Sequence, residues 1–225
     1  MRNMAVSVQQ RGSLVERGLL AIQNGTKLAQ TKDNDALYRQ VRAVYDLITD
    51  NGGTSWVGER IGREWIPISA LNEAFTTFQR LATEGYGKAY YPLSTLYGGE
   101  QSVKGDKNLA HLYSKLAFDW CLANSSRNDP EIWNDLGLVY ARQGSLKALH
   151  WFRKSADKGD AWGLYNLWGY GYGVAEMSYE ESLALLTKAA QKGNLVAILT
   201  LIREHQFNGA DHEPDDEQAL YWYRK

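Results

Sequence analysis

Small and apolar residues recur at helical spacing along the last two thirds of the chain, and the pattern repeats. Each copy has a small residue, a large apolar residue three or four positions later, and small or apolar residues at offsets seven and eight. These offsets lie on one face of a helix. The copies begin at Ala74, Ala110, Ala148, Ser182 and Ala219, so the steps are 36, 38, 34 and 37 residues. This near-constant period predicts an array of similar helical units.

A weaker helical pattern precedes each of the last four copies. It has a small or apolar residue and Leu four positions later, usually followed by a ring eight positions later. The four instances are Ala89-Leu93-Tyr97, Ile132-Leu136-Tyr140, Gly163-Leu167 and Ala197-Leu201-His205. Each unit is therefore predicted to be a helix, a turn and a second helix. Neither helix buries its apolar face alone, so the units must stack on one another.

Glycine falls where most of the second helices should end, at offset eleven. Gly85, Gly159 and Gly193 occupy this position, and Cys121 takes it in one copy. Glycine is common just after a helix because it adopts the left-handed conformation without a steric penalty. These residues therefore predict the ends of the second helices.

The run from Ala148 to Asp160 resembles the second helix of a Sel1-like repeat, as does the run from Leu186 to Asn194. Gly171-Tyr172-Gly173-Val174 is similar to the Gly-x-Gly-Val turn of that family, which is related to the tetratricopeptide repeats. The resemblance covers residues 70–225. It implies an all-α protein, a right-handed α-solenoid of helix-turn-helix repeats, that acts as a non-catalytic scaffold or adaptor for proteins. The segment after Tyr97 departs from it by lacking Gly-x-Gly, and an insertion lies near 123–130.

The N-terminal part of the chain does not show the repeat. Residues 36–50 have apolar residues on one helical face, and Asp33 or Asp35 is suited to cap the first turn. A further helix is expected over residues 6–23.

A segment with two tryptophans and two arginines, Trp56–Trp65, lies in a long connection that follows these helices. The segment is compatible with a small hairpin, and its two tryptophans are expected to fold back and cover the apolar end of the array. We therefore expect atypical helices and a long loop in residues 1–70, serving as a cap or a degenerate repeat. The repeat array is expected in residues 71–225.

Composition limits the classes of partner. The formal net charge of −1 argues against a general polyanion binder, so no nucleic-acid partner is predicted. A single cysteine, Cys121, excludes an internal disulfide framework and is predicted to be a buried, inert thiol. The absence of a long apolar run and of a signal-like N-terminus predicts no membrane partner and a cytoplasmic location.

The sequence predicts no catalytic site, cofactor or metal site. No nucleophile-elbow or phosphate-binding glycine motif occurs, and the glycines of 169–173 are predicted to form a turn because no strand precedes them. His205 stands at a core aromatic position, so a packed ring is favoured over a metal ligand with the acidic residues of 211–216. A hydrolase of cell-wall or lactam substrates, an activity proposed for a few cysteine-rich relatives, is the alternative function.

In tetratricopeptide-like stacks the first helix of each unit lines the concave face, which implies where a partner binds. The non-core positions of the first helices are predicted to contact a protein or peptide: Lys88, Tyr91, Thr95, Asn134, Leu138, Arg142, Trp162, Tyr165, Arg203 and Gln206. Asn134, Arg142 and Arg203 are predicted to hold carboxylates or backbone groups. For Tyr91, Trp162 and Tyr165 the alternative is packing between helices.

The sequence given stops within a repeat pattern, at Trp222-Tyr223-Arg224-Lys225. Two explanations are open: further repeats follow, or this end of the solenoid packs on another subunit. Self-association through the solenoid ends is therefore a second possible mode of interaction.

Overall fold

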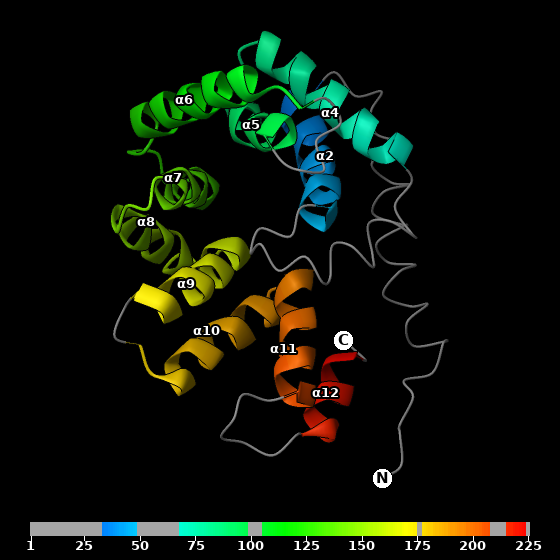
Figure 1. The fold of residues 1–225 in the computed structure, drawn as a ribbon, viewed down its shortest axis with the longest axis vertical. Coiled ribbons are helices and arrows are strands. Elements are labelled where there is room, and N and C mark those ends of the chain that lie inside the picture. The colour runs from blue at the N-terminus through cyan, green and yellow to red at the C-terminus, as the bar shows by residue number, and fades with distance from the viewer. Residues whose placement is uncertain (1–32, 49–67, 99–104, 175–176, 208–214, 224–225) are drawn as a thin grey trace. The chain divides into compact units, whose positions relative to one another are not determined.

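The computed structural model describes residues 33–48, 68–98, 105–174, 177–207 and 215–223 (Figure 1). These residues form helices and turns, with no strand among them, so the prediction of an all-α protein is confirmed. The helices are α2 (Asn34–Ile48), α4 (Ile68–Thr83), the 3-10 turn η1 (Gly87–Ala89), α5 (Tyr90–Gly98), α6 (Lys107–Ala123), α7 (Pro130–Arg142), α8 (Lys147–Ala156), α9 (Ala161–Val174), α10 (Tyr179–Gln191), α11 (Leu195–Phe207) and α12 (Asp216–Tyr223).

Residues 75–201 form one compact unit, and residues 1–74 with 202–225 form another. Within 75–201 the helices pack in chain order: α5 on α6, α6 on α7, α7 on α8, α8 on α9, and α9 on α10 (Figure 1). The predicted first and second helices are thus the pairs α5/α6, α7/α8 and α9/α10. This serial packing is that of an α-solenoid.

The residues that define the repeat pattern are the core of the array. Ala148 and Ser182 lie in the first turns of α8 and α10 and are 0% and 1% exposed, so these small residues are part of the core. Phe152 and Leu186 follow on the same faces and are equally buried. Burying each such large side chain contributes about 1.5–3 kcal/mol, so the periodic positions hold the array together.

Two kinds of glycine shape the repeats. Gly85, Gly159 and Gly193 have φ values of 80°, 74° and 85°, which confirms that they end the second helices in the left-handed conformation. Gly163 instead lies in the first helix α9. A Cβ built on it would sit 2.4 Å from Ser155 Oγ and 2.9 Å from the backbone N of Ala156. The absence of a side chain at Gly163 is what lets α8 and α9 approach.

Cys121 does not end its helix, which corrects the prediction. Helix α6 continues to Ala123, and Asn124 forms its C-cap. A cysteine, unlike glycine, pays a steric penalty in the left-handed conformation, so the helix runs on to a residue better suited to close it. The Nδ2 atom of Asn124 donates to the carbonyl oxygen of Trp120 at 2.8 Å. Cys121 is buried at 2% exposure, as predicted.

The glycines of 169–173 do not form a turn, so the prediction of a turn at these residues is wrong. Helix α9 runs through them to Val174. Gly171 is buried, and a Cβ there would lie 3.1 Å from Met177 Cε and 3.8 Å from Leu149 Cδ2. Packing around the last turns of α9 therefore outweighs the low helix propensity of glycine.

Helix α2 confirms the helix predicted near the N-terminus and selects Asp33 as its cap. The Oδ1 atom of Asp33 accepts a hydrogen bond of 3.0 Å from the backbone N of Asp35. The predicted helix over 6–23 and the Trp56–Trp65 segment lie outside the described residues. The division into 1–70 and 71–225 remains a prediction.

Candidate partner-binding surface

Successive first helices are in contact with one another: α7 contacts α9 directly, and side chains of η1 and α5 bond to side chains of α7. We call the side chains that η1, α5, α7 and α9 contribute the first-helix surface: Lys88, Tyr91, Thr95, Asn134, Leu138, Arg142, Trp162 and Tyr165. Arg203 belongs to the other compact unit, and the side chain of Gln206 lies outside the described residues. Ser94 and Asn166, which sequence reasoning missed, complete the contacts of this surface.

Lys88 is fully engaged within the chain. Its Nζ atom lies 2.8 Å from Asp129 Oδ2 and 2.8 Å from Glu131 Oε2, so it joins η1 to the start of α7. Burial lowers the pKa of Lys88, but the two carboxylates together outweigh burial and raise the pKa above its usual value. The positive charge of Lys88 is therefore balanced by the next repeat.

Arg142 is held in a different way, by neutral groups alone. Its Nη1 atom donates to Ser94 Oγ at 3.1 Å and its Nη2 atom donates to Thr95 Oγ1 at 2.7 Å. The guanidinium carbon also lies 4.9 Å from the centre of the Tyr91 ring, within the range of a cation–π interaction. Arg142 is exposed, and no carboxylate of the described residues lies within 4.0 Å of it.

A buried amide pair joins the next two first helices. Asn166 Nδ2 of α9 donates to Asn134 Oδ1 of α7 at 2.8 Å, and the two residues are 7% and 1% exposed. Neither residue carries a charge, so burying the pair costs less than burying an ion pair, and the hydrogen bond offsets part of that cost. The pair links α7 to α9, and so links two neighbouring repeats.

Four of the eight residues of the first-helix surface are buried. Tyr91, Asn134, Leu138 and Tyr165 are exposed by 3%, 1%, 7% and 4%, so they shape the surface more than they project from it. For Tyr91 and Tyr165 this burial agrees with the alternative of packing between helices. The assignment of the whole set to a partner remains a prediction.

An aromatic row runs along α9. Trp162 and Tyr165 meet edge to face with ring centroids 5.8 Å apart, and Tyr165 and Trp168 are 5.4 Å apart. Trp162 and Trp168 are partly exposed, whereas Tyr165 is buried between them. The row places flat apolar rings next to polar groups, a composition typical of protein interfaces.

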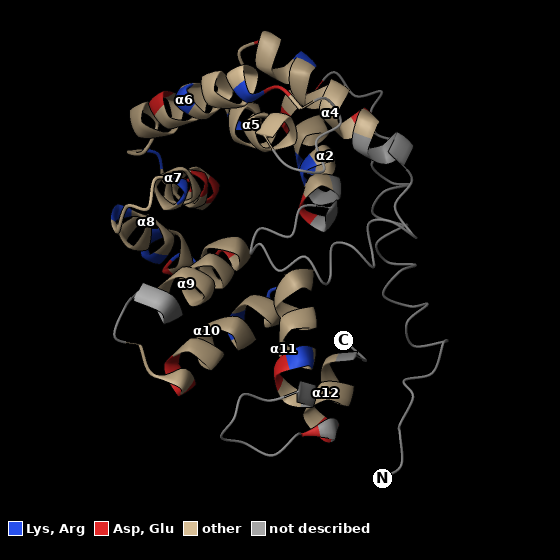
Figure 2. Cartoon of the chain, in the orientation of Figure 1, with Lys and Arg blue, Asp and Glu red and all other residues tan. Residues whose placement is uncertain are grey.

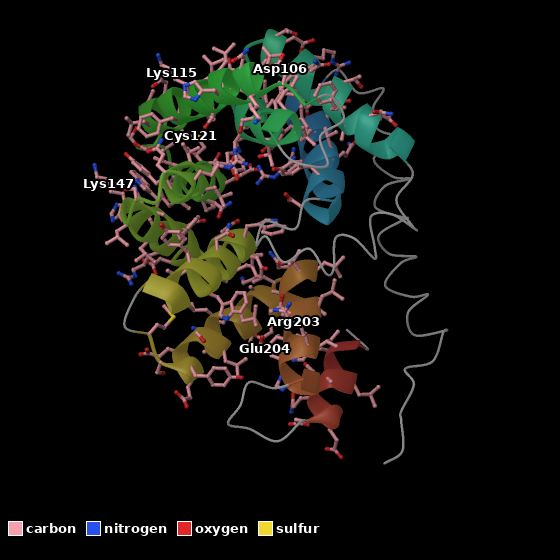
Figure 3. The ribbon with its side chains drawn as sticks, in the orientation of Figure 1. Asp106, Lys115, Cys121, Lys147, Arg203 and Glu204 are labelled. Atoms are coloured by element: carbon pink, nitrogen blue, oxygen red, sulfur yellow. The ribbon has the colours of Figure 1, made fainter. Side chains whose placement is uncertain are left out.

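The second helices carry most of their cations outward. Basic residues lie along α8 (Figure 2). The side chains of Lys115 in α6 and Lys147 in α8 point away from the ribbon (Figure 3). One cation of α8 is an exception: Lys154 Nζ lies 4.2 Å from the Trp133 ring centre and 5.1 Å from that of Trp151. Trp133 in turn donates from Nε1 to the carbonyl oxygen of Ser125 at 2.8 Å. These contacts fasten the insertion between α6 and α7.

The titratable groups do not assemble a metal site within the part of the chain that the structure describes, since no group of three or more His, Cys, Asp and Glu residues is close enough to hold an ion. His205 is partly buried, and its carbonyl oxygen accepts a hydrogen bond of 2.8 Å from the backbone N of Asp215. Most of the acidic cluster that follows His205 lies outside the described residues. None of the described helices combines the length and apolar character needed to cross a membrane.

The fold and its surface define a class: a protein built from serial helix-turn-helix repeats whose first helices lie side by side. Comparison with family models identifies the family. The model of the Sel1 repeat matches residues 136–160, 162–194 and 204–225, so this part of the chain contains three Sel1 repeats. Such repeats generally serve as non-catalytic scaffolds for protein–protein interactions.

Two solved structures resemble the chain at low sequence identity. One is a protective antigen present in uropathogenic Escherichia coli strains and displaying an SLR fold, with 23% identity and a TM-score of 0.42. The match covers 91% of this chain and 44% of the antigen, so the chain spans less than half of that protein. The other is an immunity protein from Pseudomonas aeruginosa, with 17% identity, a TM-score of 0.46, and coverage of 86% and 81%. Comparison with curated proteins finds no match.

Proposed function

We propose that this chain is a non-catalytic scaffold that binds a protein or peptide along the first-helix surface. The observation that carries the proposal is the way neighbouring first helices are joined. Lys88, Arg142 and the amide pair of Asn134 and Asn166 bridge successive first helices through their own side chains. A surface ordered in advance loses little conformational entropy when a partner binds.

The chemistry left open on this surface suits a polypeptide. Arg142 offers an exposed guanidinium, and Trp162 and Trp168 offer partly exposed indoles. Arginine and tryptophan are the side chains that most often dominate binding energy at protein interfaces. A partner with a few acidic and apolar side chains would find complementary groups along α7 and α9.

Site-specific photocrosslinking tests the proposal. A photoreactive phenylalanine analogue is placed at Gly169, which is exposed, has open space where a Cβ would be, and lies on the same face of α9 as Trp162. The control position is Lys115, which is exposed and points outward on the second helix α6 (Figure 3). Each labelled protein is irradiated in lysate of the cells that produce it. The captured partner is then purified, and its Kd for the unlabelled chain is measured.

We expect a crosslinked partner from position 169, with no such product from position 115, and direct binding of the purified partner. Crosslinks from position 115 alone would overturn the surface assignment. If neither position captured a protein that binds the unlabelled chain, the scaffold function would be wrong.

A further inference from the structure

We propose that Arg142 is the site at which the scaffold receives the side-chain carboxylate of an aspartate or glutamate in its partner. The inference rests on the proposed function, and it names the chemistry that the first-helix surface selects. The juxtaposition behind it is an exposed guanidinium of α7 that is fixed on a tyrosine ring and two hydroxyl groups of α5.

The first argument concerns hydrogen-bonding capacity. A guanidinium has five N–H donors and a full positive charge. Arg142 directs only two hydrogen bonds within the described part of the chain, and both go to neutral oxygen atoms. Its charge is therefore not paired with a carboxylate of the described residues, and a partner's carboxylate can bind it through charge-assisted hydrogen bonds, which are stronger than those to neutral oxygen atoms.

The second argument is that the hydroxyl groups are oriented to accept from Arg142. Ser94 Oγ donates to the carbonyl oxygen of Tyr91 at 2.7 Å, and Thr95 Oγ1 donates to the same carbonyl oxygen at 3.2 Å. With their protons committed to that carbonyl, both hydroxyls present lone pairs to the guanidinium. The arrangement holds Arg142 in place without cancelling its charge.

The third argument is that the guanidinium carbon of Arg142 lies over the ring of Tyr91, 4.9 Å from its centre. Tyr91 is 3% exposed and thus a fixed platform. Arginine side chains normally lose substantial rotamer entropy when they are ordered at an interface, and this loss weakens binding. Here the ordering is already present in the chain, because Tyr91, Ser94 and Thr95 supply it.

The contrast with Lys88 indicates the charge of the ligand. Lys88 is the other cation of the first-helix surface, and its ion pairs with Asp129 and Glu131 leave it with no unmatched charge. The surface therefore offers one uncompensated positive charge, at Arg142. A singly charged carboxylate matches it, and the planar guanidinium fork can bind both carboxylate oxygens.

The test uses the whole chain and peptides of defined chemistry. Random dodecapeptides displayed on phage are selected against the wild-type protein. The selected peptides are synthesised with a fluorophore, together with analogues in which each Asp becomes Asn and each Glu becomes Gln. Their Kd values are measured for wild type, Arg142→Gln and Arg142→Lys. Arg153→Gln is the matched control, since it removes an exposed arginine from the second helix α8. Circular dichroism confirms that each variant is folded.

We expect one acidic position to recur in the peptides, and its amide analogue to bind wild type about tenfold more weakly. Arg142→Gln should weaken the parent peptide by a similar factor and leave the amide analogue unchanged, so the two effects are not additive. Arg142→Lys should fall between wild type and Arg142→Gln, because it keeps the charge but loses the fork. Arg153→Gln should leave all the Kd values unchanged.

The outcomes separate the two proposals. Peptides that crosslink to position 169 but bind equally well as amides would overturn the role of Arg142 and leave the scaffold function standing. An equal loss with Arg153→Gln would also overturn it, because the effect would then be one of net charge. Failure to select any binding peptide would count against the carboxylate site, and the photocrosslinking result would decide the scaffold function separately.

Discussion

Asn166 donates a 2.8 Å hydrogen bond to Asn134 across the boundary between two repeats, and both side chains are buried. Removing one partner leaves a buried polar group without its hydrogen bond, which costs about 1–3 kcal/mol. We therefore expect Asn134→Ala to lower the urea midpoint clearly. The double variant Asn134→Leu/Asn166→Leu should lower it less than the single variant, because no polar atom is then left without a partner. Equal loss in the single and double variants would contradict this account.

Two glycines of the same helix are expected to respond to alanine with opposite signs. Gly163→Ala places a methyl group 2.4 Å from Ser155 Oγ and 2.9 Å from the backbone N of Ala156, which cannot shift without moving α8. Such overpacking costs about 1–3 kcal/mol. Gly169→Ala meets nothing within 4 Å and should gain about 0.5–1 kcal/mol from the better helix propensity of alanine. Thermal unfolding of both variants beside wild type checks the pair, and a lower Tm for Gly169→Ala would contradict the local geometry.

The start of α10 depends on a reciprocal capping arrangement. Ser178 Oγ accepts from the backbone N of Glu181 at 3.2 Å, and Glu181 Oε2 accepts from the backbone N of Ser178 at 3.0 Å. Ser178→Ala removes one of these bonds and should destabilise the chain by about 0.5–2 kcal/mol. Ser178→Gly should lower the free energy of unfolding by only about a few tenths of a kcal/mol, since glycine is tolerated at the N-cap position. Urea unfolding of the two variants measures the order, and a larger loss for the glycine variant would argue against the cap.

The ion pairs of Lys88 are expected to stabilise the fold at neutral pH and to lose this effect at strongly alkaline pH. The folded-state pKa of Lys88 is raised above 10.5, so its contribution is complete below that pH and is lost as pH rises through the raised pKa. At neutral pH Lys88→Met should cost about 1 kcal/mol, the upper range for partly exposed pairs. The difference from wild type should shrink at strongly alkaline pH.

Urea unfolding of wild type and Lys88→Met over a range of pH measures this difference. Burial raises the pKa of Tyr113, helped by the nearby Tyr97 and Tyr90, and this also reduces stability at alkaline pH. Because that effect is common to both proteins, it cancels in the comparison. Lys115→Met, which removes an exposed lysine from α6, is the control and should show little difference at any pH. A Lys88→Met deficit that stays constant through the alkaline range would rule out the ion pairs as its source.

The order of the helices follows from short-range patterns that the sequence displays directly. Ala148 and Phe152 lie on one face of α8 because of their spacing alone, and Gly159 ends the helix region because glycine tolerates a positive φ. Asp33 caps α2 for an equally local reason. Periodicity and capping involve neighbours within a few positions, so they can be read without coordinates.

Other features depended on contacts that the pattern does not contain. The glycines near Gly171 are helical, because packing at the end of α9 overrides their propensity. Cys121 lies inside α6 rather than at its end. In both cases the local rule was correct as a tendency, and tertiary packing decided the outcome.

By itself the sequence determined that pairs of helices pack one after another in chain order. Only the tertiary structure decided which side chains of the first helices are buried, which are paired within the chain and which remain exposed. Arg142 meets Ser94 and Thr95 across 48 and 47 residues, and Lys88 meets Glu131 across 43. The physical reason is that helical spacing fixes a side chain's direction, whereas its partners are set by the distance and rotation between helices that are distant in sequence.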